Sequence, residues 1–344
     1  MNKRVNGRWT WMITALIFVL FSACTMSNKS SNGAVKETEM VYYDNLKGLV
    51  PDCADPYILN HDGKYYLYGT GGKKGIRVYQ SEDLSNWSEA AGASNGFALD
   101  SVDVWGNRSF WAPEVYHLDG KFYMFFTAMS RLAIAESNSP LGPFVQKEKK
   151  PLHLDIPEID SHLFVDTDGK RYMYFVRFTG GNEIWMAEMM DDLSGIKDET
   201  LTRCFGVSEP WERTKKEPVA RVAEGPFMLK HNNLYYLFYS ANHFKSQDYA
   251  VGYAISESPF GPFRKYENNP VLVGDGKNIF GTGHHSFFKA NSGQMYIVYH
   301  SHKSGNSVQP RTTCLDRCGF ESDGENRPDK FVVYGPSTTP QPVL

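Results

Sequence analysis

Apolar and polar positions follow one layout five times along this chain. Each copy begins with a polar, acidic or aromatic residue, continues as a short apolar run, reaches a polar turn and ends in a second run rich in aromatic residues. Short alternating runs on either side of Asp-Gly or Asn-Asn are typical of β-hairpins. The five copies are DPYILNHDGKYYLYGTG, WAPEVYHLDGKFYMFFTA, DSHLFVDTDGKRYMYFVRF, EGPFMLKHNNLYYLFYSAN and HHSFFKANSGQMYIVYHSH, which start at Asp55, Trp111, Asp160, Glu224 and His284.

The spacing of the copies predicts an all-β fold, a five-bladed β-propeller. The copies recur roughly every 50 to 60 residues, and each continues into further strand-like runs such as 76–87, 132–144 and 249–263. The turn residue follows each start by seven or eight positions, so the starts share one phase. Repeats of this length with about four short strands are propeller blades. A β-sandwich is the alternative fold, but it does not predict five equally phased units.

Residues 1–23 have the pattern of a bacterial export signal. Lys3, Arg4 and Arg8 precede the apolar run WMITALIFVLFSA, which is short for a membrane-spanning helix. The sequence FSAC resembles a lipoprotein signal, in which cleavage before Cys24 leaves a lipid-modified cysteine. An ordinary secretory signal is the alternative.

The segment after this signal predicts a tethered domain. Residues 24–40 are polar and rich in Ser, Asn and Lys, as in a flexible tether. Residues 41–344 then form the propeller domain. We expect an exported bacterial lipoprotein, periplasmic or anchored at the outer membrane, that touches the membrane through a lipid on Cys24 alone.

Composition and charge restrict the partners. The chain has 344 residues, is 14% aromatic and carries a formal net charge of −3, so no basic surface predicts nucleic-acid binding. Abundant Tyr and Phe favour strands and aromatic-lined clefts. The remaining cysteines have neither disulfide-framework nor zinc-site spacing, and we expect four free or mixed-state thiols at Cys53, Cys204, Cys314 and Cys318.

The starts of the five copies are candidate functional positions. The first strand of each propeller blade lines the central channel, so these starts are expected to converge. Three of them are acids: Asp55, Asp160 and Glu224. Carboxylates that face one channel repel each other when ionised, which raises at least one pKa and favours acid–base chemistry over stability. Asp155 and Glu158 are nearby alternatives to Asp160, but they fall outside the repeat phase.

One protonated and one ionised carboxylate across a gap are the requirement for hydrolysis of a glycosidic bond. The acid protonates the departing oxygen, and the base takes a proton from the attacking water. At this point the motifs ADPYI, IDSHLF and EGPF resemble those of glycoside hydrolase family 43. Its members are five-bladed propellers that act mainly on polysaccharides containing arabinose and xylose. The resemblance extends from about Asp52 to Phe320.

This resemblance implies a role for each acid. Asp55 of ADPYI corresponds to the family's general base. Asp160 of IDSHLF corresponds to the acid that modulates the pKa of the proton donor and orients it, and Glu224 of EGPF corresponds to the general acid. Ser161 stands where proline is common in the family, a departure that should not move the carboxylate. The family inverts the anomeric configuration, which implies that the carboxyls of Asp55 and Glu224 lie about 6.5–9.5 Å apart with water between them.

The resemblance also suggests residues around the acids. Trp111 is similar to an aromatic residue near the sugar, and Arg311 to an arginine that reaches substrate hydroxyls. A core tryptophan and a solvated arginine are the structural alternatives. His284 matches a fifth-blade histidine that touches the substrate or lies beside a channel ion, often calcium, whereas His285 should point the other way along the strand.

Two further residues, Asn242 and Arg177, end aromatic strands near the expected channel mouth and are candidates for substrate binding. The chemistry should require no cofactor, and a structural calcium in the central channel is the one ion that the resemblance suggests.

The sequence thus favours an inverting, exo-acting glycosidase, an α-L-arabinofuranosidase or β-xylosidase, with an oligosaccharide or polysaccharide as substrate. An endo-arabinanase and a galactan- or galactofuranose-cleaving enzyme are alternatives within the family. A non-catalytic carbohydrate-binding propeller is the alternative outside it, but such a protein needs no set of three acids. A related propeller fructosidase is disfavoured because its Asp-Pro-Asn, Arg-Asp-Pro and Glu-Cys signatures are missing.

Overall fold

The computed structural model describes residues 40–90, 92–213 and 221–344. The chain divides into two units, 1–39 and 40–344, and the second contains the propeller. The predicted export signal, Cys24 and nearly all of the predicted tether lie outside the described residues. Among the helices of the described part, none is long and apolar enough to cross a membrane.

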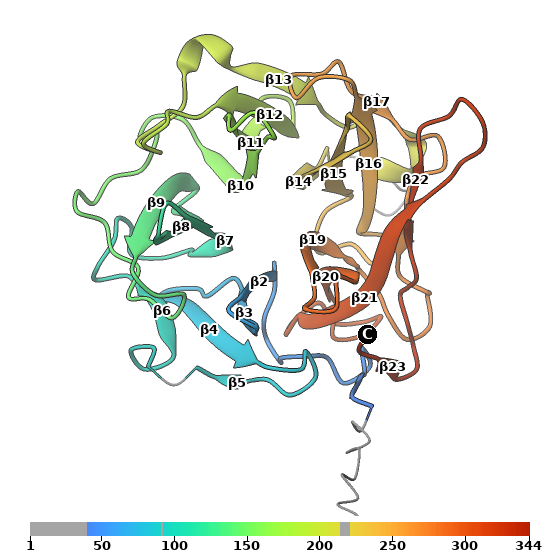
Figure 1. Cartoon of the computed structure of the whole chain (residues 1–344), viewed down its shortest axis with the longest axis horizontal. Coiled ribbons are helices and arrows are strands. Elements are labelled where there is room, and N and C mark those ends of the chain that lie inside the picture. The colour runs from blue at the N-terminus through green and yellow to red at the C-terminus, as the bar shows by residue number, and fades with distance from the viewer. Residues whose placement is uncertain (1–39, 91, 214–220) are drawn as a thin grey trace, which may run out of the picture. The chain divides into compact units, whose positions relative to one another are not determined.

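Five antiparallel sheets follow one another along the chain as the blades of a propeller (Figure 1). Blades 1 to 3 contain β2 (Tyr57–His61), β3 (Lys64–Tyr68), β4 (Gly75–Ser81), β5 (Ser88–Glu89) and β6 (Phe97–Asp100); β7 (Trp111–Leu118), β8 (Lys121–Ala128) and β9 (Arg131–Ser137); and β10 (Glu158–Val165), β11 (Arg171–Phe178), β12 (Asn182–Glu188) and β13 (Thr202–Phe205). Blades 4 and 5 contain β14 (Ala223–His231), β15 (Leu234–Ala241), β16 (Ala250–Ser256), β17 (Arg264–Lys265) and β18 (Leu272–Val273); and β19 (Gly283–Lys289), β20 (Met295–Ser301), β21 (Thr312–Glu321) and β22 (Lys330–Val333).

Short elements complete the described part. They are β1 (Tyr42–Tyr43), which pairs with β23 (Gln341–Pro342), and the 3₁₀ helices η1 (Asp198–Thr200) and η2 (Pro210–Glu212).

The innermost strands form a closed ring around the axis, as Figure 1 shows. Each contacts the next in the order β2, β7, β10, β14 and β19, and β19 returns to β2. The predicted all-β, five-bladed propeller is confirmed. Between the blades lie large aromatic side chains, fully buried; among them are Tyr68, Phe126, Tyr174, Tyr236 and Tyr299. The predicted thiols are free at Cys53, Cys204, Cys314 and Cys318.

The hairpin turns account for the regular strand order. His61 pairs with Lys64 and Leu118 pairs with Lys121, so two residues make each of these turns. Asp62 and Asp119 have positive φ angles, 49° and 52°, and the glycine that follows each of them also has a positive φ angle. Two positive φ angles in a two-residue loop match the right-handed twist of the flanking strands.

The N-terminal end of the described chain is fastened to blade 5. Asn45 is buried, and its side-chain amide donates to Leu315 O at 2.9 Å while its Oδ1 accepts from Leu315 N at 2.8 Å. A further hydrogen bond runs from Leu49 N to Thr313 O at 2.9 Å. The segment that contains Asn45 and Leu49 therefore lies along β21, where the Asn45 amide pairs with the Leu315 backbone as another strand would. It joins the N-terminal end of the domain to its last blade.

We expect Asn45→Ala to lower the free energy of unfolding by about 2 kcal/mol, because two buried backbone groups of Leu315 lose their partner. Urea unfolding followed by tryptophan fluorescence measures this change. Leu46→Ala is the matched control, since Leu46 is 52% exposed and its truncation should have little effect. Equal stabilities of the two variants would contradict a fastening role for Asn45.

Candidate active site

A two-residue bulge at the start of the innermost strand occurs in every blade. In blades 2 to 5 the pairing with the second strand jumps across the bulge, and in blade 1 the equivalent residues immediately precede β2. The first residue of each bulge has a positive φ angle, between 44° and 58°; these residues are Asp55, Ala112, Asp160, Gly225 and His284. Non-glycine residues seldom adopt this conformation, and when they do they cluster at functional sites.

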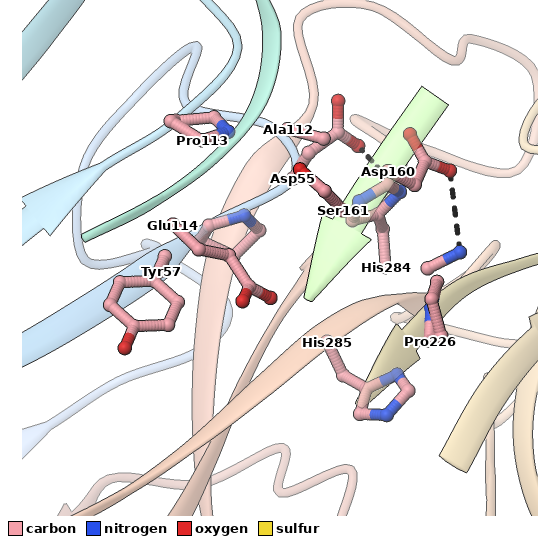
Figure 2. Close-up of a pocket in the computed structure, with 12 residues that line it drawn as sticks. Asp55, Tyr57, Ala112, Pro113, Glu114, Asp160, Ser161, Pro226, His284 and His285 are labelled. Atoms are coloured by element: carbon pink, nitrogen blue, oxygen red, sulfur yellow. Dashed lines mark hydrogen bonds and ion pairs between the residues drawn. The ribbon is translucent and has the colours of Figure 1, made fainter. Parts of the chain in front are cut away.

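The five bulges line one pocket, which Figure 2 shows in close-up. Asp55, Asp160 and His284 bring titratable groups to it, whereas Ala112 and Gly225 leave space. A Cβ atom on Gly225 would make an ordinary contact with the His284 ring, at 3.5 Å, so it is the φ angle of 56° that favours glycine at this position. Bulky and small side chains therefore alternate around the cavity, and both Asp55 and Asp160 line it.

The predicted common phase is wrong for two of the five starts. Glu224 and Trp111 immediately precede the bulge of their blades. In blade 3 the equivalent residue is Ile159, whereas Asp160 is the first residue of the bulge itself. The cause is the turn length: Val165 pairs with Arg171 in blade 3, so that turn is longer than the two-residue turns of blades 2 and 4. Counting back from the turn by a fixed number of residues therefore displaced the start by one.

Asp55 is held as an ionised carboxylate. It is 8% exposed, and its Oδ1 accepts from Arg311 Nη1 at 2.8 Å while its Oδ2 accepts from the Thr70 hydroxyl. The Nδ1 atoms of His284 and His300 lie 3.5 and 3.2 Å from Oδ1. Burial alone would raise the pKa of Asp55, but the Arg311 cation and the two histidines outweigh it and hold this pKa well below its usual range.

Asp160 and Glu224 are the protonatable pair. They are 6% and 7% exposed. Burial, the Glu224 charge and the Asp55 charge raise the pKa of Asp160 to about 7, against the opposing effect of His284. Burial and the Asp55 charge also raise the pKa of Glu224, although His284 and two hydrogen bonds oppose them. The pair therefore retains a proton under conditions in which Asp55 has lost its own.

Glu224 is positioned by two donors that the sequence did not reveal. Tyr249 Oη donates to Oε1 and Asn182 Nδ2 donates to Oε2, each at 2.9 Å. Asn182 comes from the start of β12 and Tyr249 from the loop before β16. Asn182 lies outside the repeat motifs and Tyr249 only begins the strand-like run 249–263, so no sequence signal marked either of them as a partner of Glu224.

His284 and His300 differ in charge. Burial lowers the pKa of His284, but the carboxylates of Asp55, Asp160 and Glu224 together raise it above its ordinary value. Burial and the Arg311 cation lower the pKa of His300 to about 3, so its imidazole is neutral. The ring of His300 stacks on that of Tyr249 at 5.6 Å, which links the surroundings of Asp55 to those of Glu224.

Of the predicted substrate-binding residues, only Arg311 contacts an acid of the pocket directly. Asn242 is buried and donates to the backbone oxygens of Trp211 and Asp248, so it shapes a loop. The Nε of Arg177 pairs with Glu158 Oε1 at 2.7 Å. Asn242, Arg177 and the half-buried Trp111 do not line the pocket.

The predicted calcium stays a prediction. In the described ranges, no three His, Cys, Asp or Glu side chains are grouped so that they could hold a metal ion. His284, the predicted metal residue, lies beside Asp55 (Figure 2). His285 also lines the pocket, and both of its ring nitrogens are buried without a protein hydrogen-bond partner. These nitrogens, together with the unpartnered Ser161 Oγ, fit ordered water or a largely hydrated ion.

The arrangement can perform acid–base chemistry on a bound molecule without a cofactor. Asp55, which stays ionised, and Asp160, which has a raised pKa, line the pocket, and Glu224, whose pKa is also raised, directly precedes the lining residue Gly225. Groups whose surroundings drive their pKa values apart supply both a proton acceptor and a proton donor at one pH.

The comparisons with known proteins agree with this chemistry. Residues 49–325 match the model of the family "Glycosyl hydrolases family 43". A solved structure of an endo-1,4-β-xylanase from Bacteroides thetaiotaomicron superposes with a TM-score of 0.77 at 41% identity, over 87% of this chain and 99% of that one. A β-D-galactofuranosidase of Aspergillus niger is 27% identical over 82% of this chain and 84% of its own length. A xylosidase/arabinosidase of Bacteroides ovatus is 26% identical over 73% of this chain and 87% of its own length. The chain belongs to glycosyl hydrolase family 43 and is an enzyme that hydrolyses the glycosidic bonds of oligosaccharides or polysaccharides.

Proposed function

We propose that the enzyme removes terminal α-L-arabinofuranosyl or β-xylosyl residues from plant oligosaccharides or polysaccharides, with inversion at the anomeric carbon. The observation that carries the acid–base part of this proposal is the division among three buried acids: Asp55 is held ionised by Arg311, while Asp160 and Glu224 have raised pKa values. The names of the relatives from Aspergillus and Bacteroides support a furanosyl or xylosyl substrate.

In the proposed mechanism, protonated Glu224 donates its proton to the glycosidic oxygen as the bond to the anomeric carbon breaks. Asp55 accepts a proton from the water that attacks the same carbon from the opposite face. The products are the free sugar with inverted configuration and the shortened chain, which leaves as an alcohol. Asp55 then carries a proton and Glu224 a charge, and exchange with solvent restores the starting state.

Asp160 acts in this mechanism through its charge. When Asp160 is ionised, it disfavours ionisation of Glu224, so the proton of the pair stays on the donor. Asp160 therefore needs to lose a proton before Glu224 does, although burial raises the pKa of both.

We also propose that the enzyme is exported and that a lipid on Cys24 anchors it. The support is the residue pattern of 1–23 and the cysteine that follows FSA. Globomycin treatment of expressing cells, which blocks lipoprotein signal cleavage, should make the precursor accumulate; cleavage that ignores the drug would favour an ordinary secretory signal.

The test of the activity uses purified residues 25–344. Aryl glycosides of α-L-arabinofuranose, β-D-xylose and β-D-galactofuranose are compared with arabino- and xylo-oligosaccharides, and ¹H NMR follows the first anomer released. Release of single arabinose or xylose units with inverted configuration is the expected result. Release of galactofuranose or cleavage within the chain would contradict the proposed substrate. A product that retains the anomeric configuration would overturn the proposed roles of Asp55 and Glu224.

A further inference from the structure

In the second strand of blades 2 to 5, and two residues after β3 in blade 1, one position faces the bulge of the next blade. This position lies opposite the residue that immediately precedes each bulge. Its occupants, from blade 1 to blade 5, are Thr70, Thr127, Val176, Ser240 and His300. Four of the five carry a polar atom on the side chain.

These polar side chains tie consecutive bulges together. Thr127 Oγ1 accepts the amide hydrogen of Asp160 at 3.2 Å, and Ser240 Oγ accepts that of His284 at 2.8 Å. The Nδ1 of His300 lies 3.3 Å from the amide nitrogen of Asp55, which carries the series from blade 5 to blade 1. Each bulge is thus fastened by the preceding blade, and the fastening runs around the axis.

Blade 3 interrupts this series. Val176 is fully buried and has no polar side-chain atom. The amide of Gly225, which a hydroxyl at position 176 would be placed to accept, instead donates to Asp160 Oδ2 at 3.3 Å (Figure 2). In the described part of the chain, this is the one hydrogen bond that the Asp160 carboxylate receives.

Blade 1 shows the same arrangement with the hydroxyl present. The amide of Ala112 donates to Thr70 Oγ1 at 3.2 Å, and the Thr70 hydroxyl donates in turn to Asp55 Oδ2. Asp55 and Asp160 occupy equivalent bulge positions. At this register position, Asp55 accepts a hydrogen bond from a hydroxyl that is itself polarised by an amide, whereas Asp160 accepts one from an amide alone. A hydroxyl that accepts one hydrogen bond while donating another is a stronger donor.

We propose that this register position adds to the division of roles between the two equivalent aspartates: Thr70 supplies Asp55 with a hydroxyl donor beside the Arg311 cation, and Val176 leaves Asp160 with a single backbone donor and no side-chain donor among the described residues. Thr70 and Val176 are therefore positioning residues. The names of the two roles rest on the function proposed above, whereas the difference in hydrogen bonding does not. Arg311 and the two histidines are the main cause of the low pKa of Asp55, and burial is the main cause of the raised pKa of Asp160, so the register position acts in addition to these effects.

Val176→Thr tests the proposal, because threonine has the shape of valine and supplies the missing hydroxyl. The new hydroxyl should accept from Gly225 N and donate to Asp160, as Thr70 does between Ala112 and Asp55. The titration midpoint of Asp160 should then fall by about one pH unit. We would follow its ¹³Cγ resonance in protein labelled at aspartate, with the signal assigned by its loss in Asp160→Asn. Val176→Ala, which adds no hydroxyl, should leave the midpoint within about 0.3 pH units of the wild-type value.

Kinetics give a second measurement. Because Asp55 stays ionised to low pH, the acidic limb of the kcat/KM profile reports protonation of the Asp160–Glu224 pair. Val176→Thr should move this limb to lower pH by about one pH unit. The reciprocal change Thr70→Val removes the hydroxyl donor of Asp55 and should raise the titration midpoint of the Asp55 carboxyl, read from its own ¹³Cγ resonance, while the limb set by the Asp160–Glu224 pair stays in place. This variant tests the proposal even if Val176→Thr fails to fold in a thermal unfolding scan.

The outcomes separate this proposal from the proposed function. An unchanged Asp160 midpoint in folded Val176→Thr protein, or the same shift in Val176→Ala, would overturn the proposed contribution of the register position. The NMR measurement requires no substrate. A shifted midpoint in a protein inactive on every glycoside would therefore support the register proposal and count only against the proposed function.

Discussion

Glu224→Gln should reduce kcat on unactivated oligosaccharides by about 10²- to 10⁴-fold, because the variant cannot protonate the departing oxygen. Glutamine keeps the shape of the side chain, and its oxygen can accept from Asn182 while its amide donates to the Tyr249 oxygen. Sugar affinity, measured by calorimetry on a non-hydrolysed ligand, should therefore change less than about threefold. A leaving group that departs without a proton, such as 2,4-dinitrophenolate, should recover most of the rate.

The control for this variant is Glu136→Gln. Glu136 lies half-exposed on the outer strand of blade 2, where it pairs with Lys121. This substitution makes the same chemical change outside the pocket and should leave the kinetics unaltered. Full turnover of an oligosaccharide by Glu224→Gln would remove Glu224 from the role of proton donor.

The sequence predicted the propeller because local chemistry and global repeat agree. Asp-Gly, Asn-Asn and, in the fifth copy, Asn-Ser-Gly turns set the hairpins, and aromatic second strands fill the space between the blades. These signals are short-range and occur in every repeat, so a single chain displays them five times. The same regularity led to one error, since it gave Glu224 the phase of Asp160 although a longer turn in blade 3 shifts the count by one.

The candidate site was predictable only in the residues that belong to the repeat. Asp55, Asp160 and His284 occupy bulge positions, and Glu224 directly precedes one, so the motif search found all four. Their partners Thr70, Tyr249 and Asn182 come from other strand ends and loops. Which hydroxyl or amide reaches a carboxylate depends on packing between blades, and residue spacing along the chain does not contain that information.

Arg177 has a structural partner that the sequence did not reveal. It ends an aromatic strand beside the channel, as a substrate-binding residue would, but the buried carboxylate of Glu158 takes its guanidinium. A buried charge needs a partner, and the partner lies on the adjacent strand at the paired position. The prediction considered Glu158 and Arg177 separately and so missed that each satisfies the other.

Asp55→Asn should be at least as damaging as Glu224→Gln, and its effect should not depend on the leaving group. The variant cannot take the proton of the attacking water, a step that every substrate requires, so kcat/KM should fall by about 10²- to 10⁴-fold even on dinitrophenyl glycosides. The change also leaves Arg311 without its buried countercharge, which destabilises the fold. A thermal unfolding scan must therefore show a folded variant before its rate is interpreted.

Asp55→Ala with sodium azide separates loss of the base from loss of the fold. The smaller side chain leaves room for azide, which attacks the anomeric carbon without giving up a proton, so the aryl glycoside should become a glycosyl azide of inverted configuration and release the phenolate. Azide should rescue this variant and have no such effect on Glu224→Gln, whose defect lies in the leaving group. Rescue with retained configuration, or a wild-type rate in Asp55→Asn without azide, would show that another group activates the water, and His284 beside Asp55 would be the next residue to test.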